Sequence, residues 1–140
     1  RDIYPVIVKP HEITPGDYGQ AITVGDISFV PFEQDHGGIT SLGFHFGRLA
    51  YSTDMKDLCD QSVDLLQGVE YWIADASDYK KPDEISYVHC NLQNLYDLND
   101  RIQAGTTYLT HLTPYMDYDT VNAELPDGYH MCYDGLVIEV

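Results

Sequence analysis

Basic side chains are scarce in this sequence. Seven lysines and arginines stand against 23 aspartates and glutamates, which gives a formal net charge of −16. A surface this negative repels a phosphate backbone and argues against nucleic-acid binding by the chain alone. If the substrate is a phosphate ester, bound metal ions have to supply the positive field locally. The alternative is that the acidic residues only keep the surface solvated.

Long apolar runs and paired cysteines are missing as well. The longest apolar runs span only a few residues, so we expect no membrane span, and nothing at the start resembles a secretion signal. The three cysteines, Cys59, Cys90 and Cys132, are odd in number and form no CxxC pair. This pattern fits neither a zinc knuckle nor a full disulfide framework. We expect reduced, mostly buried thiols in a cytoplasmic protein.

Enough apolar side chains remain to build a core. They make up 44% of the 140 residues, too many for a disordered segment, and the length suits one domain or part of one. We find no internal repeat, low-complexity tract or linker. Residues 1–140 are therefore treated as a single domain.

The first part of the chain alternates apolar and polar positions between turn signals, as strands do. Gly25-Asp26 predicts a hairpin between two of these strands. Four consecutive short strands with tight turns predict an antiparallel sheet. The expected segments are an edge strand or extended arm at Tyr4–Ile13 and strands at Ala21–Val24, Ile27–Phe32, Ser41–Phe46 and Leu49–Thr53.

The second part alternates helical and strand patterns. Leucines and an isoleucine from Leu92 to Ile102 recur at three- and four-residue spacing and predict a helix over His89–Ala104 that ends at Gly105. Strands followed by helix–strand alternation indicate an α/β (α+β sandwich) fold, with a mixed sheet and helices on its outer face. Two further helices are expected, at Asp60–Leu66 and at Asp119–Leu125, the latter with Asp119 as N-cap. Further strands are expected at Val69–Ala74, covered on both faces, and at Thr106–Thr110, with a loop at Ser77–Val88. A last strand pair is expected at Tyr129–Tyr133 and Leu136–Val140 across Asp134-Gly135.

Three polar residues at predicted strand ends are candidate metal ligands. His36 lies in a glycine-rich turn, Asp54 ends an apolar strand, and His111 follows another strand. Imidazole and carboxylate groups on loops held by rigid strands are typical of metal sites, and mixed sheets tend to place ligands at carboxyl strand ends. Taken singly, each residue also fits a structural role: a surface histidine, a helix N-cap and a hydrogen-bonded loop histidine.

A set of motifs in fixed order resembles one known family. From about Ile27 to Val140 the sequence carries PFEQDHG, SLGFHFG, LAYSTD, WIADA, YLTHL and YDGLVIEV. This ordered set resembles the second half of metallo-β-lactamase-fold metal-dependent hydrolases. Within them it is similar to the phosphoribosyl 1,2-cyclic phosphodiesterase-like group, which is related to tRNA 3′-processing endonucleases. The resemblance implies the C-terminal half of an αββα sandwich.

The resemblance also implies roles for single residues. It makes His36 and His111 the end ligands of two divalent metal ions, Zn or Mn, with Asp54 bridging the pair. Besides Asp54, it gives catalytic work to His89, which would contact the substrate phosphate and protonate the leaving oxygen. Asp75 would hold a ligand histidine by a hydrogen bond. The remaining histidines match no motif, and we expect structural or surface roles for them: His11, His45 and His130.

One part of the family signature is missing from the chain. None of its six histidines forms the His-x-His-x-Asp-His loop that supplies four metal ligands, and the chain opens at Arg1 without a methionine. We therefore expect the C-terminal half of a longer enzyme. With that loop restored, the expected activity is hydrolysis of small cyclic or nucleotide phosphodiesters by a hydroxide shared between two metals.

Other functions and partners remain open. The same fold would also suit a tRNA 3′-processing-type nuclease or a thioester hydrolase, and a chain without the loop could be a non-catalytic module. A missing half would leave a sheet face and edges exposed, so we expect a homo-oligomer or association with the missing N-terminal half. The isolated chain should bind metal weakly and hydrolyse little, because a catalytic zinc takes about three protein ligands.

Overall fold

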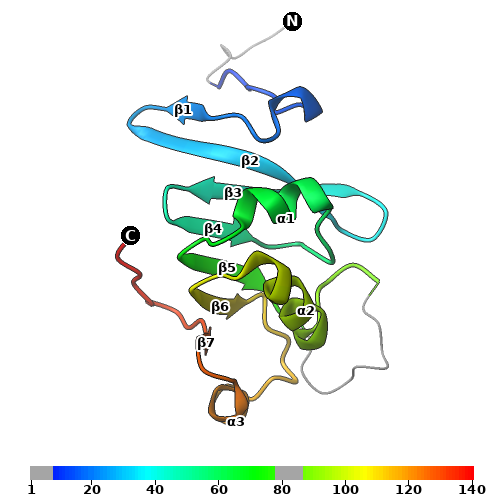
Figure 1. Cartoon of the computed structure of the whole chain (residues 1–140), viewed down its shortest axis with the longest axis vertical. Coiled ribbons are helices and arrows are strands. Elements are labelled where there is room, and N and C mark those ends of the chain that lie inside the picture. The colour runs from blue at the N-terminus through cyan, green and yellow to red at the C-terminus, as the bar shows by residue number, and fades with distance from the viewer. Residues whose placement is uncertain (1–7, 78–86) are drawn as a thin grey trace, which may run out of the picture.

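The computed structural model describes residues 8–77 and 87–140. Their centre is a seven-stranded mixed sheet in which the strands lie in chain order (Figure 1). A short 3₁₀ turn, η1 (Pro15–Asp17), precedes the sheet. The strands are β1 (Ile22–Val24), β2 (Ile27–Asp35), β3 (Thr40–Phe46), β4 (Leu49–Ser52), β5 (Tyr71–Asp75), β6 (Thr106–Thr110) and β7 (Tyr129–Met131), and the helices are α1 (Asp60–Leu66), α2 (Leu92–Ile102) and α3 (Tyr118–Glu124).

Strand direction brings four strand ends to one edge of the sheet. β1 to β4 are antiparallel neighbours, whereas β4 to β7 run parallel. Parallel neighbours need a crossover between them, and α1, α2 and α3 lie in those connections. Because β2 and β4 are both antiparallel to β3, the carboxyl ends of β2, β4, β5 and β6 share one edge.

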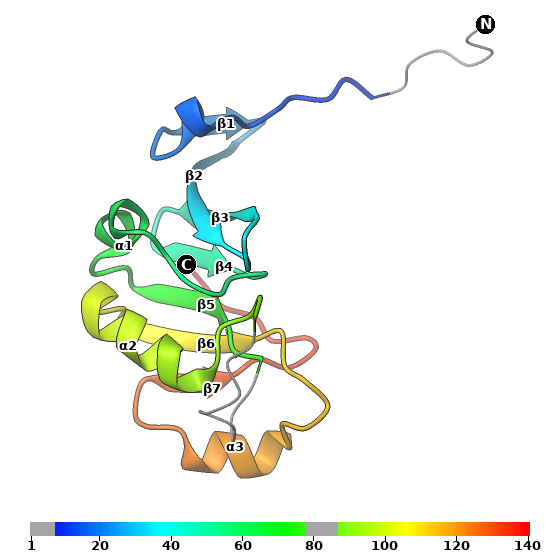
Figure 2. The same ribbon diagram turned by 90° about the vertical axis from the view of Figure 1, so that its right-hand side faces the viewer.

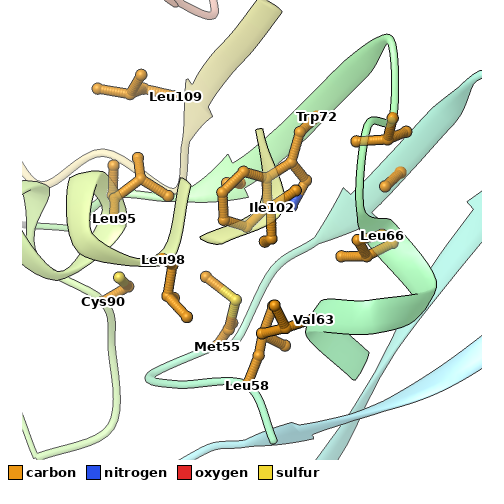
Figure 3. Packing of buried hydrophobic residues seen from close by; sticks show 14 of the residues in the cluster. Met55, Leu58, Val63, Leu66, Trp72, Cys90, Leu95, Leu98, Ile102 and Leu109 are labelled. Atoms are coloured by element: carbon orange, nitrogen blue, oxygen red, sulfur yellow. The ribbon is translucent and has the colours of Figure 1, made fainter. Parts of the chain in front are cut away.

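Helices α1 and α2 lie together on one face of the sheet (Figure 2). Trp72, in β5, is fully buried under them, and its indole N–H donates a hydrogen bond to Ser52 Oγ at 3.0 Å. Burial of this apolar surface is the main favourable term in folding. The labelled members of this core are Met55, Leu58, Val63, Leu66, Trp72, Cys90, Leu95, Leu98, Ile102 and Leu109 (Figure 3).

The opposite face of the sheet keeps apolar side chains at the surface. Strand pairing puts Phe44, Tyr51, Ile73 and Tyr108 side by side in one row across β3 to β6, and all four are half-buried or exposed. We call this row and the hollow beside it the open face. An apolar sheet surface normally packs against a second layer. The hollow measures about 380 Å³ and is lined by Val24, Ile27, Phe29, Phe44 and Phe46.

Several predicted elements are confirmed. The helix at Asp60–Leu66 and the strand at Thr106–Thr110 have the predicted bounds. The turn at Gly25-Asp26 joins β1 to β2 as a hairpin. The mixed sheet with helices packed on a face is also present. Apolar periodicity and turn residues were sufficient to predict these elements, because the local signal and the tertiary packing agree.

Two expectations about burial are wrong. β5 is covered on one face only: Trp72 is buried under the helices, whereas its neighbour Ile73 points to the open face and is half-buried. All three cysteines are free thiols, but Cys59 is exposed and Cys132 is half-buried, so Cys90 alone among them is fully covered. Cys59 occupies the N-cap position of α1.

Helix α2 is shorter than predicted at both ends. It begins at Leu92 instead of His89, because the Asn91 side chain accepts a hydrogen bond from the backbone of the first turn. Asparagine is among the best N-cap residues. The helix closes at Gln103, which adopts a left-handed φ of +58° before Gly105 is reached. His89 therefore lies in the loop before α2 and not in its first turn.

The C-terminal region also differs from prediction. The N-cap of α3 is Asp117 instead of Asp119, because the Asp117 carboxylate accepts a hydrogen bond from the Thr120 N–H. The predicted strand Leu136–Val140 is absent; the chain instead turns, with the Leu136 N–H donating to the Tyr133 carbonyl. β7 consequently has no hairpin partner on that side.

Two predicted segments fall partly outside the described residues. Residues 8–13 of the arm at Tyr4–Ile13 form no strand, and the start of that arm is not described. The loop at Ser77–Val88 is described at its two ends. No helix in ranges 8–77 and 87–140 is long and apolar enough to cross a membrane.

Gly43 is expected to tolerate no side chain. A Cβ there would lie 2.2 Å from the Phe32 ring and 2.6 Å from Gln34 Oε1. Overpacking of this kind costs about 1–3 kcal/mol, so Gly43→Ala should lower the urea midpoint of unfolding accordingly. Gly16→Ala is the control, because the nearest atom to its Cβ is Thr14 Oγ1 at 3.7 Å. Equal midpoints for the two variants would contradict the packing described here.

Candidate metal centre

Residues from separate parts of the chain meet at the shared carboxyl edge of the sheet. His36 follows β2, Asp54 follows β4, Asp75 ends β5 and His111 follows β6. His89 joins them from the loop before α2. The sequence predicts His36, Asp54, Asp75 and His111 at strand ends and His89 at a helix start, and the strand directions bring the four strand ends together.

The His36 ring is held by a backbone carbonyl. Its Nδ1 lies 2.7 Å from the Val88 oxygen, and because a carbonyl oxygen only accepts, Nδ1 carries the proton. Nε2 is then the ring atom with a lone pair for a metal, and it lies 3.9 Å from Asp54 Oδ1. Gly37 permits the close approach of the Tyr87–Val88 backbone to the His36 loop. Its φ is +68°, and a Cβ there would lie 2.6 Å from the Tyr87 carbonyl oxygen.

Asp54 is fixed through its backbone. Its φ of +52° lies in the left-handed region, which aspartate tolerates better than most residues. Ser41 Oγ donates to the Asp54 carbonyl at 2.6 Å. The fully buried Gln34 donates from Nε2 to the Thr53 carbonyl at 2.9 Å and to Ser41 Oγ at 3.0 Å. These bonds hold the turn and leave the carboxylate to face the site.

Gln34 and Ser41 were not identified from the sequence. They lie opposite each other in the β2–β3 register, and Gln34 stands between Glu33 and Asp35 in a polar stretch that resembles a surface position. A usable signal is that Gln34 shares a strand face with Phe32, two residues earlier, which is in the core. A polar residue on a core-facing position needs partners, and here the partner is the turn that carries Asp54.

His111 lies close to the carboxylates of Asp54 and Asp75. Its Nδ1 lies 3.7 Å from Asp54 Oδ1 and 3.5 Å from Asp75 Oδ2. Its φ is +61°, and non-glycine residues with such backbone angles collect at functional sites. Together with the His36 distance, this puts Asp54 Oδ1 between the two imidazoles. The structure thus brings the three candidate ligands together.

Asp75 anchors His89. His89 Nδ1 lies 2.8 Å from Asp75 Oδ2, and the Met55 N–H donates to the same oxygen at 3.1 Å. The carboxylate is completely buried, and burial raises the pKa of Asp75 while the His89 hydrogen bond opposes that rise. The family resemblance predicts a ligand histidine as the partner of Asp75, but the shorter contact is to His89, with His111 further away.

The donor atoms suit a divalent transition metal. One set of atoms within 4.8 Å of one another comes from His36, Asp54 and His89, and a second comes from Asp75, His89 and His111. Imidazole nitrogen with carboxylate oxygen is a ligand set that zinc and manganese accept. Asp75 Oδ1 is buried and has no hydrogen-bond partner within the described residues, which leaves an acceptor open at the site. The residues present therefore fit a metal.

Other polar groups lie away from this cluster or are unsuited to it. His45 pairs with Val30 and Ala50 within the sheet, and the His130 ring contacts Tyr108. Cys90 is adjacent to His89, but burial, and then the Asp75 charge, raise the pKa of its thiol well above the usual range. A thiol held in the neutral form is a poor nucleophile.

A family model matches residues 2–112 and is described as the beta-lactamase superfamily domain. This chain belongs to the beta-lactamase superfamily. The match covers most of the chain and confirms the predicted resemblance. The mixed sheet with its helices is the metallo-β-lactamase fold expected of such a member.

This superfamily member is similar to two solved structures and one curated relative. A diphosphatase from the PhnP family is 29% identical, with a TM-score of 0.77 over 85% of this chain and 45% of that chain. The metallo-beta-lactamase fold protein YhfI from Bacillus subtilis is 20% identical, with a TM-score of 0.71 over 86% of this chain and 52% of that chain. An octanoyltransferase of Porphyromonas gingivalis is 27% identical over 114 residues, which are 81% of this chain and 23% of that protein.

This superfamily member therefore spans about half the length of the two solved structures and about a quarter of the curated relative. A chain of about half that length is expected to carry only some of the residues of a metal site of this fold. The residues described above are the part that this chain contributes.

Proposed function

We propose that this chain is the C-terminal half of a metal-dependent hydrolase that cleaves small cyclic or nucleotide phosphodiesters. The observation that carries the proposal is the position of Asp54 Oδ1, 3.9 Å from His36 Nε2 and 3.7 Å from His111 Nδ1. A carboxylate between two imidazoles from distant loops is an arrangement that can serve two cations. The diphosphatase similarity supports a phosphate ester as the substrate class.

His36, Asp54 and His111 would hold the metals, with Zn²⁺ or Mn²⁺ as the expected ions. When bound, two divalent ions lower the pKa of a shared water and neutralise charge that develops on the phosphate. Asp54 contributes a full negative charge between the two positions. His36 keeps Nε2 directed at this point because its Nδ1 proton is held by the Val88 carbonyl.

His89 would bind and orient the phosphate. Asp75 Oδ2 accepts the hydrogen bond from His89 Nδ1, so contact with substrate falls to Nε2. A proton on Nε2 can bond to a phosphate oxygen or pass to the leaving oxygen. The buried Asp75 carboxylate holds the His89 ring beside the rings of His36 and His111. The His89 ring centroid is 5.0 Å from that of His36 and 4.4 Å from that of His111.

The open face supports the idea that another layer completes the site. Its apolar row lies on the side of the sheet away from α1 and α2. We propose that an N-terminal half with the His-x-His-x-Asp-His loop packs there, in the same polypeptide or as a separate chain; a homo-oligomer is the second arrangement. The net charge of −16 weighs against a tRNA substrate.

Metal content and turnover test the proposal together. The isolated chain, dialysed against Zn²⁺ or Mn²⁺, should retain less than one ion per chain and hydrolyse bis(p-nitrophenyl) phosphate slowly. A longer polypeptide that adds a His-x-His-x-Asp-His loop should retain two ions and turn over rapidly. Rapid turnover by the isolated chain would contradict the incomplete site. A longer polypeptide that binds metal but cleaves no phosphodiester would remove the phosphodiesterase proposal and leave a thioester hydrolase of this fold.

A further inference from the structure

A lysine side chain lies on the loops that carry the candidate metal centre. Lys56 is two residues after Asp54, and its backbone N–H donates to the Asp35 carbonyl at 2.7 Å. Asp35 immediately precedes His36. Met55, the residue between Asp54 and Lys56, donates to the buried Asp75 carboxylate. The backbone of Lys56 is thus fixed beside the site on two sides.

The Lys56 ammonium is held by an aromatic ring and by no carboxylate in the described residues. Its Nζ lies 5.5 Å from the centroid of the Tyr87 ring, within cation–π range. Tyr87 itself is two residues before His89, and its carbonyl oxygen packs against Gly37 next to His36. The ring is 72% exposed. The pair therefore joins the Asp54 loop to the His89 loop at a surface that solvent and ligand can reach.

The two described arginines, by contrast, are each paired with a carboxylate. Arg48 forms an ion pair with Glu70 at 2.9 Å, and Arg101 pairs with Asp60. Within the described residues Lys56 has no acidic partner, although the full sequence carries 23 acidic residues. A positive group beside two divalent cations is repelled by them. Its position becomes favourable when an anion with more than one negative oxygen lies between it and the metals.

We propose that Lys56 is the anion-binding residue of the substrate site and that it contacts a phosphate oxygen not taken by the metals. Tyr87 is a positioning residue that keeps the ammonium turned toward the site. This inference rests on the proposed function and adds to it a recognition group that selects phosphate-bearing substrates. Metals, Lys56 and His89 would then surround the phosphate from different sides.

The experiment uses the longer polypeptide that adds the His-x-His-x-Asp-His loop, loaded with zinc, and measures its binding of inorganic phosphate by calorimetry. Lys56→Gln should weaken phosphate binding about tenfold, because a charge-assisted hydrogen bond is lost, and Lys56→Arg should restore most of it. Tyr87→Leu should weaken binding less, whereas Tyr87→Phe should leave it nearly unchanged, because a Phe ring still attracts the ammonium. Arg48→Gln is the matched control: it removes the same charge at a residue paired with Glu70.

The outcomes separate this inference from the proposed function. Zinc content is measured for every variant and should not depend on Lys56. If zinc binds but Lys56→Gln and Arg48→Gln change phosphate affinity equally, the ammonium acts only through net charge and the inference is overturned. If the longer polypeptide takes up no zinc, the proposed function fails, and the same comparison on the metal-free protein decides the Lys56 subsite. No phosphate binding in either state overturns the inference.

Discussion

Replacing Asp54 with asparagine is expected to lower the affinity for Zn²⁺ or Mn²⁺ by about 100-fold or more, since loss of groups that merely orient ligands already costs about 10–100-fold. The carboxylate lies between His36 and His111, so one change removes a ligand for both positions. Asparagine preserves the size of the side chain and accepts the left-handed φ of +52°. The fold should therefore survive, and calorimetric metal titration with a thermal melt of the same sample measures both properties.

The control for this prediction is Asp64→Asn, which removes the same charge from an exposed position on α1. It should change metal affinity by less than a factor of about two, because surface charges are screened by salt. If Asp54→Asn and Asp64→Asn have the same effect, the carboxylate of Asp54 is not a ligand. An Asp54→Asn protein that keeps full affinity would also rule out the bridging role.

Trp72→Ala is expected to cause the largest loss of stability, about 3–5 kcal/mol, which is the usual cost of truncating a fully buried aromatic residue. The indole fills the space between β5 and the two helices (Figure 3). Its removal also leaves the buried Ser52 hydroxyl without the N–H that it accepts. Urea unfolding followed by circular dichroism measures the effect. Trp72→Phe should cost less, because most of the buried surface is kept.

Tyr51→Ala is the matched comparison on the open face. Tyr51 is 40% exposed. In a monomeric chain, Tyr51→Ala should therefore lower the free energy of unfolding by well under half of the loss caused by Trp72→Ala. A cost as large as that of Trp72→Ala would mean that the open face is covered in solution. That result would favour association through this face, and sedimentation of the same sample would reveal it.

Local sequence signals predicted the elements whose ends are set by local chemistry. The helix Asp60–Leu66 and the strand Thr106–Thr110 agree with prediction because periodicity, turns and packing favour the same bounds. Helices α2 and α3 each begin where a side chain caps the first turn: at Asn91 and not at His89, and at Asp117 and not at Asp119. The strand predicted at Leu136–Val140 rested on a hairpin turn at Asp134-Gly135, but the segment after that turn does not pair with β7.

The metal-ligand candidates were identifiable because they follow strands and match family motifs, whereas their supports were not. That Gln34 faces the core depends on the register of β2 against β3, and a shift of one residue would turn it to the other face. The short contact between Asp75 and His89 joins residues 14 apart in the chain. Nothing in either local pattern indicates that they touch.

The hydrogen bonds from Gln34 and Ser41 have a consequence for which ions the site can admit. They act on backbone carbonyls, so the turn that carries Asp54 is fixed whether or not an ion is bound. A rigid turn cannot move outward to accommodate a larger cation. Calcium, which needs six to eight oxygen ligands at about 2.3–2.6 Å, would meet too few oxygens at fixed positions. We therefore expect Gln34 and Ser41, through the turn that they hold, to make the candidate site favour small cations over calcium.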